Sequence, residues 1–262
     1  MPATLAWPSL VAACLALLAA SPTTIAAEGR GEGARDRADL PAVHDTISWK
    51  FTPTYYRSSN EPNAWDFNLR GNTEKQTWWV GYYRRDDEFQ QLRLGYEHHV
   101  ELSYARLVPS LQYATRGFLG GSLSAEIGEE RYFGILGWGR TNLKDYYNLN
   151  FDPNDAVTFG IGTRALPNTT LSLFQIYDDR LHTGQRVTHL VARIKPDEQT
   201  RWTVDIFHKQ GRPDSDPSSE QVRGTGVSVA YDFDRYFVHV AGDPHVNFSN
   251  NNMVRVAVGI RF

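Results

Sequence analysis

The chain has 262 residues, of which 41% are hydrophobic and 13% aromatic, and its formal net charge is −3 at pH 7. No apolar run after residue 21 approaches the roughly 20 residues that a membrane-spanning helix needs, so a helical membrane protein is excluded. The slightly acidic balance also argues against a general nucleic-acid partner.

Residues 1–27 have the features of an export signal. The apolar run Ser9–Ala20 is followed by small residues that end at Ala27, as in a cleaved signal peptide. Cleavage there would remove Cys14, the single cysteine, and leave a mature chain without disulfides. Residues 28–43 are rich in charged residues and glycine, which predicts a disordered periplasmic leader. The folded domain is predicted to span residues 44–262.

From Thr46 onward, apolar residues alternate with polar or small residues in about fourteen segments. A period of two places successive side chains on opposite faces of a β-strand, so the pattern predicts an all-β protein. The alternating segments include those that contain Trp49, Phe67, Val80, Leu94, Leu123, Phe159, Val204, Val229 and Val256. The turns between residues 100 and 131 are unclear because Pro109 interrupts the pattern, and the facing of Tyr132–Trp138 is ambiguous. Twelve strands therefore remain an alternative to fourteen.

The connections between these segments alternate in length. The long ones are Thr141–Asn154, Asp178–Gln185, Gln210–Glu220 and Asp243–Asn252. The short ones are Asn72–Lys75, Leu166–Asn168, Pro196–Thr200 and Asp232–Arg235. Short turns at one end and long loops at the other are typical of a transmembrane β-barrel. The apolar face is also complete in nearly every strand, with no edge strand marked by charge or proline, which favours a closed sheet over a soluble sandwich.

Aromatic side chains gather at the end that carries the short turns. The predicted register places seven of them at one height, namely Trp49, Trp78, Tyr96, Trp202, Tyr231, Tyr236 and Phe262. Amphipathic rings at one level form the belt that marks a membrane interface.

The last segment, Met253–Phe262, reads MVRVAVGIRF. Val256 and Val258 share one face with Phe262, whereas Ala257 lies on the other. This segment resembles the closing strand of bacterial outer-membrane β-barrels, whose terminal phenylalanine is read by the barrel-assembly machinery. The resemblance implies an all-β, transmembrane, antiparallel up-and-down barrel of about fourteen strands in a Gram-negative outer membrane. Both termini would be periplasmic, and the barrel would contact lipid and lipopolysaccharide.

Charged side chains recur on the polar face of the strands. The candidates for lining the lumen are Lys50, Asp66, Arg70, Arg93, Glu97, His99, Glu126, Arg164, Arg193, Asp205, Lys209, Asp232, Arg255 and Arg261. Charges in a poorly hydrated interior must pair or line water. An open lumen would form a passive or substrate-selective channel that favours anions, because Arg and Lys outnumber Asp and Glu. A fully paired network would instead seal a structural or adhesive barrel.

An enzyme is a further alternative. Glu97 and His99 lie near Ser103, a combination that can serve nucleophilic catalysis. The loops carry a second set of candidates, namely Asp152, Asn154, Asp155, Asp178, Asp179, His182, Asp243, His245 and Asn247. Their oxygen atoms are suited to Ca²⁺, but the same residue types also simply form turns. The segment Asp179–Gly184 resembles one segment of a lipid A deacylase family, which implies a lipid-modifying activity. The sequence has no Walker loop, G-x-S-x-G or H-E-x-x-H motif, and no cofactor is expected.

Overall fold

The computed structural model describes residues 47–86, 89–149 and 152–262. The predicted signal peptide and leader lie outside these described residues. No helix within them is long and apolar enough to cross a membrane.

The described residues form one antiparallel sheet in which strands that follow one another in sequence are hydrogen-bonded neighbours. The elements are β1 Ser48–Ser58, β2 Ala64–Asn72, β3 Gln76–Arg85, β4 Phe89–His98, β5 Val100–Glu101, β6 Ala105–Ala114, β7 Phe118–Gly128, β8 Tyr132–Thr141, β9 Ala156–Leu166, β10 Thr169–Asp178, β11 Arg186–Ile194, β12 Thr200–Gly211, β13 Val222–Phe233, β14 Tyr236–Asp243, the 3₁₀ turn η1 Val246–Phe248 and β15 Met253–Arg261.

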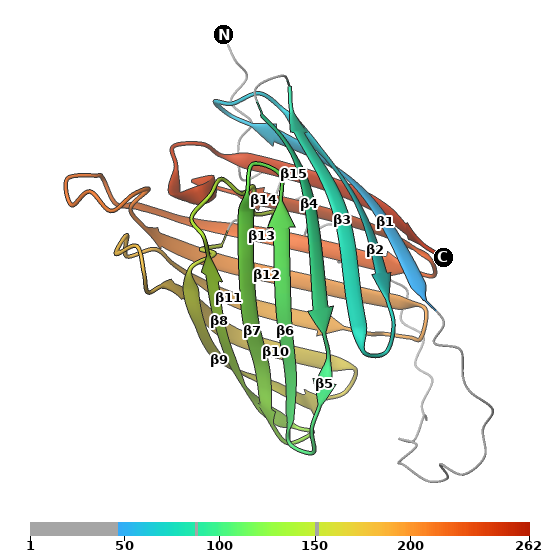
Figure 1. The fold of residues 1–262 in the computed structure, drawn as a ribbon. Coiled ribbons are helices and arrows are strands. Elements are labelled where there is room, and N and C mark those ends of the chain that lie inside the picture. Colours follow the sequence, from blue (N-terminus) through green and yellow to red (C-terminus); the bar gives the residue numbers. More distant parts are fainter. Residues whose placement is uncertain (1–46, 87–88, 150–151) are drawn as a thin grey trace, which may run out of the picture. The chain divides into compact units, whose positions relative to one another are not determined.

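The sheet closes on itself. The first strand, β1, pairs with β15, where Tyr55 faces Val256, and Figure 1 shows this blue strand beside the red one. The short β5 continues β4 beyond a break at His99, since both pair with β6. Because β4 and β5 share one position in the ring, the fifteen labelled strands form a closed up-and-down barrel of fourteen strands. This confirms the predicted fold and the larger of the two predicted strand counts. Closure removes the unpaired edges on which sheets aggregate.

The two faces of the wall differ as the alternation predicts. Leu94, Leu190 and Val258 are 43%, 49% and 51% exposed on the outside of the barrel. In contrast, Arg93 and Ala257, next to them in sequence, are 1% and 3% exposed. An apolar exterior and a polar interior are the arrangement of a barrel that stands in lipid.

The segments whose turns or facing the sequence left open are now assigned. Strand β6 runs through Pro109 without a break. In β8, Tyr132 and Trp138 are exposed and Phe133 is buried. Gly134 and Gly137 stand between these aromatic residues, and glycine carries no hydrophobic signal, so the alternation could not be followed there.

One end of the barrel carries short turns and a row of aromatic side chains. Trp49 and Trp78 both pair with Gly71, and Tyr96 pairs with Trp78. The rings of Trp49 and Trp78 meet edge to face at 6.3 Å. Phe262 exchanges backbone hydrogen bonds of 2.8 and 3.0 Å with Trp49, so it lies in this row.

Candidate functional site

The longest connection, residues 142–155 between β8 and β9, turns into the barrel. Gln91 of β4 donates its side-chain amide to the carbonyl of Asp145 at 2.8 Å and accepts the backbone N–H of Tyr147 at 2.9 Å. The neighbouring Arg93 donates from Nη1 to the carbonyl of Tyr147 at 3.0 Å. Backbone groups of the loop are therefore held by inward side chains of one strand. We call this segment the inward loop.

Aromatic packing reinforces this attachment. The ring of Tyr147 stacks on that of Tyr83, with centroids 3.6 Å apart, and approaches Tyr56 edge to face at 6.3 Å. Tyr146 stacks on Phe118 at 4.0 Å. Tyr56 and Tyr83 are 2% and 0% exposed, and burial raises the pKa of the Tyr147 hydroxyl. The loop thus fills an apolar cluster on one side of the interior.

The other end of the inward loop reaches a different wall. Oδ1 of Asp152 lies 3.2 Å from Nε2 of His189 on β11, and Nδ1 of His189 lies 3.0 Å from Oδ2 of Asp205 on β12. The ring of Phe174 stacks on the imidazole at 4.8 Å. Since β4 and β11 lie on nearly opposite sides of the ring of strands, the loop crosses the lumen.

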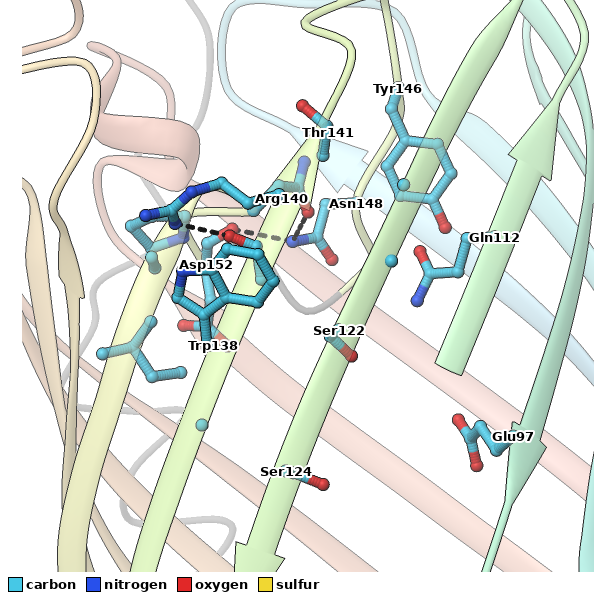
Figure 2. A pocket seen from close by; sticks show the side chains of 18 of the residues that line it. Glu97, Gln112, Ser122, Ser124, Trp138, Arg140, Thr141, Tyr146, Asn148 and Asp152 are labelled. Carbon is cyan, nitrogen blue, oxygen red and sulfur yellow. Dashed lines mark hydrogen bonds between the residues drawn. The ribbon is translucent and has the colours of Figure 1, made fainter. Parts of the chain in front are cut away.

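Two cavities lie beside the inward loop. One has a volume of about 360 Å³ and the other about 300 Å³, and Asp152 lines both. Figure 2 shows Glu97, Gln112, Ser122 and Ser124 on the wall strands around the larger cavity. The loop is braced there by Asn148, whose side-chain amide donates to the carbonyl of Asp152 at 2.7 Å.

Most charged side chains of the interior are paired. Arg93 and Asp66 form an ion pair in which both side chains are 1% exposed. The further pairs are Lys209–Asp243 at 2.5 Å, Arg164–Glu126 at 2.5 Å, Arg70–Glu97 at 3.9 Å and Arg201–Asp232 at 3.0 Å, together with Arg261–Asp232. Pairing is expected, because an isolated buried charge is costly.

Two cations of the interior form no ion pair within the described residues, and a third contacts the inward loop. Lys50 lies over the ring of Phe237 at 4.0 Å. Arg193 is exposed to the smaller cavity and forms no ion pair within the described residues. Arg255 donates from Nη1 to the carbonyl of Leu149 in the inward loop. The ion pairs of the described residues therefore leave an excess of positive charge in the lumen.

Two of the predicted loop candidates lie in the interior rather than at the mouth. Asp152 is carried inward by the loop that crosses the lumen. Asp243 is the last residue of β14, is 4% exposed and pairs with Lys209. Strand alternation continues to that residue and turns its side chain inward, which a loop assignment from the sequence alone could not show.

The other loop candidates hold neighbouring loops together. Arg140 pairs with Asp179 at 2.6 Å, and Arg180 pairs with Asp155 at 2.6 Å, so two ion pairs join the β10–β11 connection to the end of β8 and to the β8–β9 connection. The carboxylate of Asp178 accepts three backbone N–H groups of its own loop. The remaining candidates have local contacts, with Asn154 accepting from Asn148, His182 from Arg212, His245 beside the carbonyl of Ser249, and Asn247 within η1.

The geometry gives little support for metal binding or catalysis at these residues. Among the described residues, no three His, Cys, Asp or Glu side chains are placed to hold a metal ion. Nε2 of His99 lies 4.0 Å from Oε2 of Glu97 and 3.4 Å from Oγ1 of Thr77, and its Nδ1 lies 3.2 Å from Arg106. This is the surrounding of a structural histidine at the barrel end. The sequence analysis missed His189, although its place on an inward strand position was a usable signal.

No protein-family model matches the chain, and no curated protein matches it. Among solved structures it is similar to the Acinetobacter baumannii outer membrane protein Omp33, with a TM-score of 0.54 and 10% identity over 82% of this chain and 98% of that chain. It also matches the KdgM porin in complex with disordered oligogalacturonate (TM-score 0.45, 10% identity, 81% of this chain and 99% of that one). A Salmonella typhi OmpF complex with daunomycin matches with a TM-score of 0.46 and 9% identity over 83% of this chain and 97% of that one. The similarity to Omp33 and the closed fourteen-stranded barrel confirm the predicted class: the chain has the fold of an outer-membrane β-barrel protein.

Proposed function

We propose that the protein is a constricted channel that passes small polar solutes across a bacterial outer membrane. The observation that carries this proposal is the inward loop, which is fixed to both walls and leaves polar cavities of about 360 and 300 Å³ beside it. A barrel whose only task was structural could fill its lumen with ion pairs alone. An attached loop narrows the lumen and leaves polar space on each side.

The outer face of the barrel supports this location. An apolar face with an aromatic belt at one end is suited to lipid. With the short turns at the periplasmic side, both ends of the barrel chain are periplasmic and the long loops face outward, as in barrels of this class.

The solutes are small anions or carry anionic groups. Lys50 and Arg193 form no ion pair within the described residues, and Arg193 lines the smaller cavity together with Arg255. Arginine remains charged under all ordinary conditions, and pores that select anions use arginine and lysine on their walls.

The test is conductance of the purified protein in a planar bilayer. We expect small, ohmic steps, and a reversal potential in a KCl gradient that reports a modest preference for chloride. A preference for potassium would contradict the anionic assignment. Absence of conductance, both in the wild type and after removal of residues 144–152, would contradict the channel and favour a sealed structural barrel.

A further inference from the structure

Three successive rows of side chains cover the outer face of β10–β13 toward the long-loop end. The register pairs Leu173, Leu190, Ile206 and Val227 in the first row. It pairs Gln175, Thr188, His208 and Thr225 in the second and Tyr177, Arg186, Gln210 and Arg223 in the third. The surface therefore changes from apolar to neutral polar to cationic over four residues along each strand. We call the third row the arginine row.

The two arginines of this row are close enough to act together. Arg186 and Arg223 are both exposed and pair with opposite sides of Gln210. Their backbones are two strand spacings apart, which is about 10 Å, so both long side chains can reach one ligand. Neither forms an ion pair within the described residues. Arg223 donates to the side-chain oxygen of Gln221 at 3.4 Å, which is an uncharged partner.

A polar recess adjoins the arginine row. It has a volume of about 410 Å³, and its lining includes Tyr177, His182, Arg212, Ser219 and Gln221 but no carboxylate. Nε of Arg212 is buried without a hydrogen-bond partner in the described structure. Two of the three acidic residues of the same loop face its serines, since Asp214 accepts from Ser219 at 2.7 Å and Asp216 from Ser218 at 2.8 Å; the third, Glu220, is exposed and does not line the recess. The recess is thus a place for hydroxyl groups and anions.

The apolar row leads into a groove on the lipid-facing wall. This groove has a volume of about 520 Å³, and Leu173 and Leu190 form part of its lining together with Ile161 and Leu171. Gly134 also lines it, and a side chain there would meet no atom nearer than 3.6 Å. Ile127 and Tyr132 line it too, so the groove extends from the apolar row toward the short-turn end.

We propose that this face is a specific site for a phosphorylated glycolipid of the outer leaflet, such as lipid A. Its phosphates bind Arg186 and Arg223, its sugar hydroxyls occupy the recess, and its acyl chains lie over the apolar row. Arginine suits this ligand because its guanidinium donates two parallel hydrogen bonds to a phosphate. The site rests on the proposed outer-membrane location but does not depend on the lumen being open.

The experiment measures binding by native mass spectrometry of delipidated protein in detergent, with lipid A as the probe. We expect the double variant R186Q/R223Q to bind lipid A about tenfold more weakly, the loss that follows from removing about 1.4 kcal/mol of charge-assisted hydrogen bonding. The matched control R57Q/R131Q removes two exposed arginines elsewhere and should bind as the wild type does. Circular dichroism checks that each variant keeps its β-structure.

The outcomes separate the possible ligands. Equal binding by R186Q/R223Q and the wild type would overturn the site, and an equal loss in R57Q/R131Q would reduce it to general charge attraction. Inorganic phosphate that displaces lipid A at millimolar concentration would assign the row to small phosphates instead and overturn the lipid assignment. Conductance is recorded in parallel, so a failed channel with intact lipid binding contradicts only the proposed function.

Discussion

The two attachments of the inward loop are built from different chemistry. On the β2–β4 side, the loop is held by stacked, buried rings and by backbone groups bonded to Gln91 and Arg93. On the β11–β12 side, it is held by one carboxylate, Asp152, which contacts His189. The first attachment buries apolar area and makes several contacts. The second depends on one polar pair beside a cavity.

This difference indicates which part of the loop can move. Aromatic burial and buried hydrogen bonds contribute several kcal/mol together, whereas a single hydrogen-bonded pair contributes about 1 kcal/mol. The Tyr147 end is therefore the fixed end, and the Asp152 end is the one whose displacement would change the width of the lumen. Breaking each attachment in turn tests this assignment.

The largest effect is expected at the base of the fixed attachment. Arg93→Ala would leave Asp66 buried without its partner and should reduce the free energy of unfolding by about 3–5 kcal/mol. Urea unfolding of the barrel in lipid vesicles, followed by tryptophan fluorescence, measures this. The double variant Arg93→Ala/Asp66→Ala should recover part of the loss. If it recovered none, the buried charge would not be the cause.

The next effect tests the aromatic part alone. Tyr147→Ala removes a ring that packs against Tyr83 and Tyr56, and large-to-small changes of buried aromatic residues cost about 3 kcal/mol. Single-channel conductance should rise, because the loop loses its fixed end. Tyr113→Ala, a change of the same size at an exposed position outside the barrel, is the control and should leave conductance as it is. An unchanged conductance in Tyr147→Ala would mean that the loop does not constrict the path.

The sequence predicted the wall far better than the loop. Alternation identifies the facing of Leu94 or Ala257 because the membrane imposes opposite chemistry on neighbouring residues. Nothing comparable acts on residues 142–155, whose polar composition is equally suited to an external loop. The useful signal was Tyr146-Tyr147, a pair of large rings in a connection that should otherwise be polar. Their partners, Phe118 and Tyr83, come from distant strands, so only the closed barrel could show the contact.

A smaller effect is expected at the movable attachment. Asp152→Asn keeps the shape of the side chain but removes its charge beside His189, which should cost about 1 kcal/mol. Stability should therefore change little, while channel records should show more frequent transitions between conductance levels. Asp155→Asn is the comparison, because that carboxylate binds Arg180 at the base of the inward loop and does not contact the opposite wall. Records that are equally noisy in both variants would contradict a specific role for Asp152.

The smallest expected effect concerns the charge between the two attachments. Arg255 lies on β15, lines the smaller cavity and donates to the carbonyl of Leu149, midway along the loop. Arg255→Gln keeps a donor and the approximate length of the side chain but removes the positive charge. The reversal potential in a KCl gradient should move toward potassium by a few millivolts, since Lys50 and Arg193 remain. Because the inward loop keeps a hydrogen-bond donor at this position, conductance should stay close to that of the wild type. A large change in conductance with no change in reversal potential would instead show that Arg255 is a third attachment of the loop. The loop would then be fixed at its middle as well as at the Tyr147 end, and the division into a fixed end and a movable end would be wrong.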